Sequence, residues 1–116
     1  MKWTTLLTLI ALSLAPALGV WADEKSDGQK VFEKWCAPCH AKGDHYPGTV
    51  ALEARYNGAV PGPLQERVDL TPDLVKHFVR NGISVMPFFR KTEISDTELD
   101  ALTQYLQKQP SQPSKQ

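Results

Sequence analysis

The stretch WCAPCH, residues 35–40, decides how this 116-residue chain is interpreted. It holds both cysteines of the sequence, Cys36 and Cys39, separated by two residues, and His40 follows them directly. Two closely spaced thiols beside an imidazole are typical of redox-active, metal-binding or covalently modified sites. The rest of the sequence has to show which of these chemistries the stretch serves.

The first 22 residues have the pattern of a secretory signal peptide. Lys2 gives a positively charged start, and residues 6–18 (LLTLIALSLAPAL) are mostly apolar. Val20 and Ala22 suit the −3 and −1 positions of a cleavage site. The apolar run is short for a membrane span and contains Pro16. We therefore expect cleavage near Ala22, a periplasmic location and no stable membrane insertion.

Cleavage would leave one small domain, residues 23–108, and a polar, proline-rich tail at 109–116 that we expect to be disordered. The whole chain carries 13 basic and 13 acidic residues, and loss of Lys2 shifts this balance by one charge. Such a near-neutral domain gives no reason to expect nucleic acid as a partner. In an oxidising compartment, Cys36 and Cys39 should form a disulfide or be bonded to another group.

Hydrophobic periodicity predicts three helices and no strand. The first helix covers about Asp27 to Cys39, with Ser26 and Gln29 in a capping-box pattern. Residues 42–70 are instead punctuated by proline and glycine, with a short helical turn expected at 50–55. Long loops of this kind are often functional.

The second and third helices have clear start signals. Thr71, Pro72 and Asp73 open the second, and Gly82 ends it; its apolar residues are Leu74, Val75, Phe78 and Val79. Ser95 and Glu98 form a capping box that opens the third helix. Its expected buried face consists of Leu99, Leu102, Tyr105 and Leu106.

One interpretation of the motif is a thioredoxin-like thiol–disulfide oxidoreductase that uses Cys36 and Cys39. Such a site needs its first cysteine at the N-terminus of a helix that follows a strand, where the helix dipole lowers the thiol pKa. Here the cysteines lie at the far end of a predicted helix, and no strand is expected before it. The segment Val85-Met86-Pro87 resembles the proline turn that faces such sites, and keeps this alternative open.

The other interpretation is the attachment site of a c-type haem, with the pattern C-x-x-C-H. Two thiols at this spacing can bond to the two vinyl groups of one porphyrin, and His40 is then held beneath the iron as an axial ligand. A disulfide between Cys36 and Cys39 would close a loop too short to stabilise much, and would leave His40 unexplained. The sequence therefore favours one covalently bound haem c.

A second axial ligand is expected from Met86. Met1 is the other methionine of the chain, and it belongs to the predicted signal peptide. Met86 follows the second helix, and Pro87 restrains the backbone beside it, so a thioether could reach the iron. His45 and His77 are the competing ligands. His45 is close to His40 in sequence, and His77 is expected to be a solvated helix residue.

Together these residues resemble the class I cytochromes c over about Asp27 to Leu106. The resemblance rests on Gly28, Phe32, residues 36–40, Gly62-Pro63-Leu64, Asn81-Gly82, Met86-Pro87 and Tyr105. It implies a small all-α fold around one haem, and single-electron transfer to a redox protein partner rather than catalysis. It also implies that Gly28 and Tyr105 mark a helix crossing. The Pro63 carbonyl would then bind the second nitrogen of His40.

A finer resemblance is to the cytochrome subunit of flavocytochromes of the p-cresol methylhydroxylase type. It is carried by Val79-Arg80-Asn81-Gly82 together with Met86-Pro87-Phe88-Phe89. In those proteins the cytochrome accepts electrons from a flavoprotein that oxidises alkylphenols. The resemblance therefore implies a flavoprotein dehydrogenase subunit as the partner of this chain.

Several further residues are candidates for contact with haem. The expected pocket walls are Trp35, Leu64, Leu70, Leu74, Phe78, Val79, Val85 and Phe88. Arg67 and Arg80 could pair with a haem propionate, although a solvated surface position is the expectation for each. Because Phe88 and Phe89 are adjacent, one ring can face the haem while the other faces outward for docking.

Overall fold

The computed structural model describes residues 25–108, so the predicted signal peptide and tail lie outside the described part of the chain. Its elements are α1 (Asp27–Val31), the π-helix η1 (Phe32–Cys36), α2 (Ala37–His40), α3 (Pro47–Tyr56), the 3-10 turn η2 (Leu64–Glu66), α4 (Pro72–Asn81) and α5 (Asp96–Lys108). Between residues 25 and 108 no strand forms, and one isolated bridge pairs Ile83 with Met86. The all-α prediction is confirmed. No helix in this range is long and apolar enough to cross a membrane.

The first predicted helix is a continuous rod made of α1, η1 and α2. Ser26 caps it by accepting a hydrogen bond from the Gln29 backbone N–H at 3.2 Å. The Gln29 side chain binds Glu33 instead of closing the capping box. The π-turn, in which the Ala37 N–H bonds to the Phe32 carbonyl, was not expected from the sequence. Its extra residue rotates the later part of the rod by roughly 100° about the helix axis.

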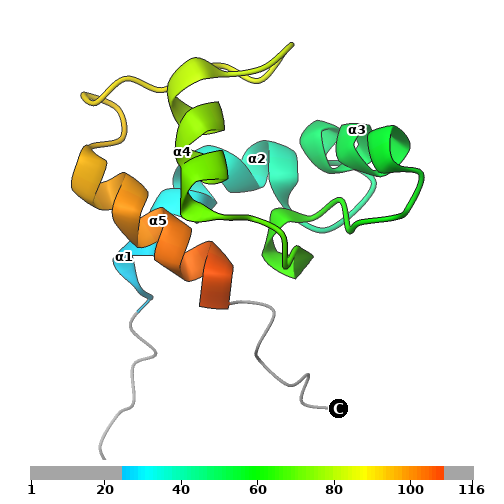
Figure 1. The fold of residues 1–116 in the computed structure, drawn as a ribbon, viewed down its shortest axis with the longest axis horizontal. Coiled ribbons are helices and arrows are strands. Elements are labelled where there is room, and N and C mark those ends of the chain that lie inside the picture. Colours follow the sequence, from blue (N-terminus) through cyan, green and yellow to red (C-terminus); the bar gives the residue numbers. More distant parts are fainter. Residues whose placement is uncertain (1–24, 109–116) are drawn as a thin grey trace, which may run out of the picture.

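This rod crosses α5 at very close range, as Figure 1 shows for α1 and α5. A Cβ atom on Gly28 would lie 2.6 Å from the Ala101 carbonyl carbon and 2.7 Å from the Tyr105 Cβ. Only glycine therefore allows this approach. The Tyr105 ring packs on Phe32 with centroids 5.7 Å apart, and its hydroxyl accepts a hydrogen bond from Gln65 at 2.5 Å.

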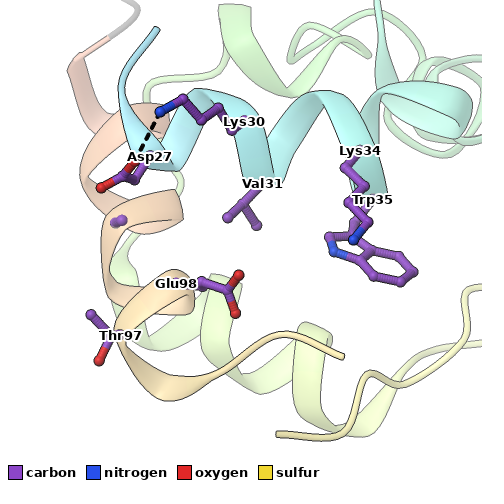
Figure 2. A pocket seen from close by; sticks show the side chains of 8 residues that line it. Asp27, Lys30, Val31, Lys34, Trp35, Thr97 and Glu98 are labelled. Atoms are coloured by element: carbon purple, nitrogen blue, oxygen red, sulfur yellow. Dashed lines mark hydrogen bonds and ion pairs between the residues drawn. The ribbon is translucent and has the colours of Figure 1, made fainter. Parts of the chain in front are cut away.

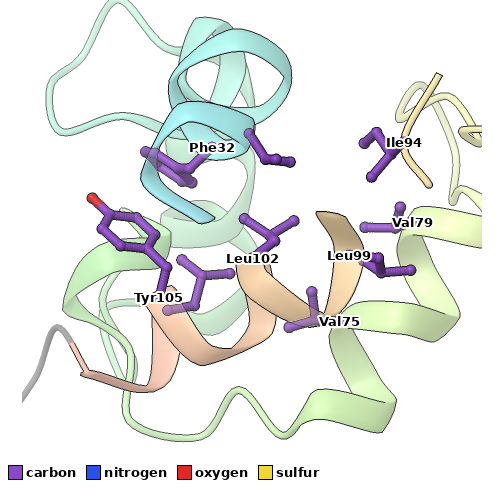
Figure 3. Close-up of a cluster of buried hydrophobic side chains, with 9 residues drawn as sticks. Phe32, Val75, Val79, Ile94, Leu99, Leu102 and Tyr105 are labelled. Carbon is purple, nitrogen blue, oxygen red and sulfur yellow. The ribbon is translucent and has the colours of Figure 1, made fainter. Parts of the chain in front are cut away.

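The hydrophobic core lies where the rod, α4 and α5 meet (Figure 3). All four predicted core residues of α5 are buried, and the other members of the cluster are Val31, Phe32, Val75, Val79 and Ile94. The apolar stripe of α4 divides between two directions. Val75 and Val79 enter this core, whereas Leu74 is exposed and Phe78 half-buried.

The starts of α4 and α5 follow the sequence signals closely, because they depend on local hydrogen bonds. Thr71 accepts from the Leu74 N–H at 3.3 Å. In the capping box of α5, the Ser95 N–H donates to Glu98 at 2.7 Å, and the Glu98 N–H donates back to the Ser95 hydroxyl at 3.2 Å. The helical turn expected at 50–55 is longer than predicted and forms the whole of α3.

Candidate functional site

The motif lies at the C-terminal end of the helical rod. Cys36 ends η1, and His40 is the last residue of α2, after which Ala41 turns the chain into an extended conformation. The Ala41 carbonyl accepts a 2.6 Å hydrogen bond from the Thr49 hydroxyl of α3. This bond ties the start of α3 to the residue that follows His40.

The imidazole of His40 is covered by α3 on one side. A Cβ atom on Gly48 would lie 2.6 Å from His40 Cε1, 2.7 Å from Nδ1 and 2.8 Å from the Cys39 carbonyl oxygen. Nδ1 is buried, and the described residues offer it no hydrogen-bond partner. Burial lowers the pKa of His40, and the nearby charge of Arg67 lowers it further. Both effects favour the neutral imidazole, which is the form that binds a metal.

The two cysteines differ in exposure, and no disulfide joins them. Cys36 is half-buried against the core, and Cys39 is exposed. Burial raises the pKa of the Cys36 thiol to about 12, with a smaller contribution from Cys39. At neutral pH this thiol is therefore protonated, unlike the activated thiolate of a redox enzyme.

Pro63 is buried close to α3, but its carbonyl does not bind His40. It accepts the Glu66 N–H at 3.1 Å, while His40 Nδ1 stays without a partner. The adjacent Gly62 packs on α3, where a Cβ would lie 2.6 Å from the Thr49 carbonyl oxygen. The hydrogen bond expected between Pro63 and His40 is thus absent from this structure, although Pro63 lies in the segment that packs on the helix beside His40.

Met86 lies in a tight hairpin that leaves the end of α4. Ile83 and Met86 exchange backbone hydrogen bonds of 3.2 and 2.9 Å, and Ser84 takes a positive φ of 53° between them. The loop closes where the Phe89 N–H donates to the Val79 carbonyl at 2.7 Å. In Figure 1 the hairpin projects from the top of α4 on the side where α2 and α3 lie.

The two competing histidines are both exposed. The His45 side chain pairs with Asp44 at 3.3 Å and is otherwise surrounded by solvent. His77 lies on α4, where its ring contacts Phe78 edge-on and approaches the amide of Asn81. His77 is the surface helix residue that the sequence predicts.

The apolar candidates for the haem pocket fall into three groups. Trp35, Leu64 and Leu70 pack on the edge of the core, and Val79 is fully inside it. Leu74 is exposed and Phe78 is half-buried, and neither belongs to the core cluster. Phe88 is 59% exposed. Val85 is 95% exposed at the corner of the hairpin, and this exposure does not support its predicted role as a pocket wall.

The neighbouring Phe89 points inward. Its ring meets Trp35 edge-on, with centroids 5.6 Å apart. The two adjacent rings therefore face in different directions, but Phe88, which was expected to line the haem pocket, is the outward ring and Phe89 is the inward one.

Arg67 is not the solvated surface residue that the sequence suggests. It is only 5% exposed, and it donates through Nε and Nη2 to both carboxylate oxygens of Asp69, at 2.9 and 2.5 Å. Its guanidinium also lies over the Tyr56 ring, 5.2 Å from the centroid. The end of α3 is thus tied to the loop that follows Pro63.

A shallow hollow of about 240 Å³ lies between the rod and α5 (Figure 2). Its charged residues are Asp27, Lys30, Lys34 and Glu98. Asp27 and Lys30 pair with each other at 3.2 Å, and Glu98 is used in the capping box. The hollow therefore brings together no group of side chains free for chemistry.

The residues present suit a c-type haem. Two cysteines one helical turn apart supply the thiols, and a neutral imidazole with a buried Nδ1 lies directly after them. A methionine stands in a fixed hairpin on a different element. Nitrogen and thioether donors are typical axial ligands of haem iron.

Comparison with known proteins supports this. A family model described as cytochrome C oxidase, cbb3-type, subunit III matches residues 23–106. The chain belongs to this family of c-type cytochromes. It is also 30% identical over 97 residues to cytochrome c6 of Cyanidioschyzon merolae, an alignment that covers 81% of this chain and 85% of that protein. No solved structure matches the chain.

The cytochrome is therefore a mono-haem electron-transfer protein and not an enzyme, with covalently bound haem c and its iron. Its function requires a redox protein partner. Membership of the family confirms the expected class I cytochrome c fold and cofactor. It leaves the ligand residues of this chain, and the identity of the partner, as proposals.

The structural roles of two residues beside the motif were not identified from the sequence of this cytochrome. Gly48 allows α3 to pass close to the imidazole of His40, where a side chain would collide with the ring. In the sequence alone, Pro47-Gly48 has the pattern of an ordinary turn. Arg67 is buried because its charge is met by Asp69 two residues away. The i, i+2 spacing of Arg67 and Asp69 was the available signal, but such pairs are common on surfaces.

Replacing Gly48 with alanine tests the contact between α3 and His40. The new methyl group would meet ring and backbone atoms, so we expect a loss of about 1–3 kcal/mol in unfolding free energy and a changed visible spectrum of the haem. Urea unfolding and absorption spectra measure both. Ala54→Gly is the control, because it weakens α3 by about 1 kcal/mol without touching His40. Equal effects on the spectrum would contradict the contact.

Replacing Asp69 with asparagine tests its ion pair with the buried Arg67. Arg67 holds the pKa of Asp69 below its usual value, so the carboxylate stabilises the fold above the unfolded pKa of about 4, and this contribution disappears as the pH falls through the lowered pKa. Because the Asp69 side chain is partly exposed, we expect Asp69→Asn to lower the free energy of unfolding by only about 1–2 kcal/mol at pH 7. At pH 3 the loss should be much smaller, since the wild-type carboxylate is then largely protonated in the unfolded state. A cost that is equal at both pH values in urea unfolding would refute this.

Proposed function

We propose that Cys36 and Cys39 attach the haem through thioether bonds and that His40 and Met86 are its axial ligands. The main support is the position of His40, which is fixed at a helix end, half-buried and in its neutral form directly after the two cysteines. Met86 is the remaining soft donor, and its hairpin has few accessible conformations because hydrogen bonds close it at both ends. Both exposed histidines, His45 and His77, would have to leave their present surroundings to bind iron.

Each residue would have a defined task in this arrangement. The two cysteines hold the cofactor at the end of the rod, and His40 supplies an imidazole whose orientation is restrained by Gly48. When bound, the haem iron supplies one-electron Fe(III)/Fe(II) chemistry. Met86 would hold the iron together with His40, which would leave no position for a substrate, and its thioether would favour the reduced state.

We further propose that the protein acts in the periplasm after removal of residues 1–22. The basic start, the apolar run and the small residues near Ala22 support this. A c-type cytochrome with this leader would carry electrons between redox partners outside the cytoplasm.

The proposed electron donor is a flavoprotein that oxidises alkylphenols. The sequence Val79-Arg80-Asn81-Gly82 with Met86-Pro87-Phe88-Phe89 supports this choice. The exposed side chains of Ile83, Val85 and Phe88 surround Met86 in the sequence, and residues 81–89 contain no charged side chain. Such an apolar surface suits docking that depends little on electrostatic attraction.

The alternative is a thiol–disulfide oxidoreductase. Two observations weigh against it: residues 25–108 form no sheet, and burial raises the pKa of Cys36 to about 12. The cysteines also lie at the end of a helix, where the dipole disfavours a thiolate. A haem electron carrier accounts for His40 and Met86, and the alternative leaves both without a role.

Met86→Ala tests the axial ligand. We expect the haem to stay attached, the weak near-infrared band of Met–Fe(III) coordination to vanish and the reduction potential to fall, because the thioether no longer favours Fe(II). Absorption spectra and a redox titration give both results. His45→Ala and His77→Ala are the controls and should keep the band. A band that survives in Met86→Ala would exclude Met86 as the ligand.

The proposed partner is tested with the flavoprotein encoded nearest to this gene, reduced with 4-methylphenol. We expect it to reduce the cytochrome in stopped-flow experiments, and Val85→Glu to slow this by about tenfold, as for loss of an apolar docking contact. Val68→Glu is the matched control, because Val68 is 83% exposed just before the opposite end of α4. No electron transfer would exclude this donor; equal slowing by both variants would exclude the docking surface.

A further inference from the structure

Arg80 makes an unusual set of contacts at the end of α4. Its Nη1 atom donates to the carbonyl of Phe89 at 3.0 Å and to that of Ile94 at 2.9 Å. Its Nη2 atom pairs with the carboxylate of Asp96 at 2.8 Å. One side chain thus joins the end of α4, the segment that leaves the Met86 hairpin and the first residue of α5.

These contacts close the loop that carries Met86. At its start, the Gly82 N–H bonds to the Phe78 carbonyl at 2.7 Å, and the backbone of Gly82 has a φ of 67°. At its end, the Phe89 peptide is held on both sides, since its N–H binds Val79 and its carbonyl binds Arg80. Met86 lies three residues before this fixed point.

The surroundings make the guanidinium a strong restraint. The Arg80 side chain is only 22% exposed, and Ile94, whose carbonyl it binds, is fully buried. Hydrogen bonds from a charged donor are stronger than neutral ones. Asp96 is also held by Lys91 at 2.7 Å, and these two partners, Lys91 first, keep the pKa of Asp96 below its usual range. The carboxylate therefore stays charged opposite Arg80 at neutral pH.

We propose that Arg80 is a positioning residue that holds Met86 at the iron by fixing the return of its hairpin, without contacting the haem. The inference rests on the proposed ligation by Met86. A thioether is a neutral, weak ligand for Fe(III), so its retention depends on how little freedom the loop has. Only the planar fork of arginine can bind two carbonyls and a carboxylate in fixed directions, whereas lysine supplies a single ammonium group.

The test compares Arg80→Gln and Arg80→Lys with the wild-type protein carrying its haem. The readout is the pH at which the near-infrared Met–Fe(III) band disappears, together with the reduction potential. We expect Arg80→Gln to weaken retention of Met86 by about tenfold, as for one charge-assisted hydrogen bond, so that the band disappears about one pH unit lower and the potential falls. Arg80→Lys should shift in the same direction by a smaller amount.

Arg90→Gln is the matched control. It removes the same charge from the residue that follows the hairpin, and, among the residues the structure describes, the exposed Arg90 side chain forms an ion pair with Glu93 alone, at 3.6 Å. An equal shift in Arg90→Gln would overturn the inference, because a general charge effect would then explain the result. Unchanged pH values in both Arg80 variants would also overturn it. If Arg80→Gln does not accumulate, Arg80→Lys decides the question. A lower pH for the disappearance of the band supports the inference, and an unchanged pH overturns it.

The controls also separate this inference from the proposed function. If the wild-type protein lacks the band, Met86 is not the ligand and both proposals fail. If the wild-type protein shows the band and Met86→Ala removes it, but Arg80 variants behave as wild type, the ligand assignment stands and only the role of Arg80 is wrong.

Discussion

The close crossing of α1 and α5 at Gly28 determines where the motif lies relative to the rest of the protein. A side chain at this position would collide with the backbone of Ala101, so the close approach of the two helices depends on glycine. The same helical rod carries Cys36, Cys39 and His40 at its other end. A small shift at the crossing would therefore move the motif as a unit.

Helix α5 also positions the second half of the site. Its first residue, Asp96, pairs with Arg80 of α4, and Lys76 of α4 pairs with Asp100 one turn further on. The hairpin that contains Met86 directly follows the C-terminal end of α4. Helix α5 thus packs against both the rod that ends in His40 and the helix that leads to Met86, two elements that lie far apart in the sequence. A domain this small has little other core with which to place them.

The sequence predicted best those features that depend on neighbouring residues. The capping signals at Thr71 and Ser95 located the starts of α4 and α5, and the buried face of α5 followed from its periodicity. The motif and Met86 could be proposed as haem-binding residues because that chemistry depends on residue type and spacing. The capping box predicted at Ser26 forms only in part. Ser26 accepts the Gln29 N–H as predicted, but the Gln29 side chain donates to Glu33 and not back to the start of the helix.

The features that the sequence did not predict depend on contacts between distant segments. Arg80 is mostly buried because the carbonyls of Phe89 and Ile94 accept its hydrogen bonds. No local sequence pattern predicts that these two carbonyls lie beside Arg80. The contact of Gly48 with His40 requires α3 to begin at Pro47, whereas the sequence predicted only a short turn at 50–55. The π-turn over Phe32–Cys36, which includes the first cysteine of the motif, likewise has no local sequence pattern that predicts it.

The proposed function depends on covalent attachment of one haem to Cys36 and Cys39 and on export of the protein. Its sharpest test is the mass of the denatured protein purified from the periplasm, with Cys36→Ala/Cys39→Ala as the comparison. We expect a chain that begins after Ala22 and carries the mass of one haem, and a double variant without it. A wild-type chain that lacks the haem and is two hydrogen masses lighter, as a Cys36–Cys39 disulfide would make it, would show that the cysteines do not attach haem.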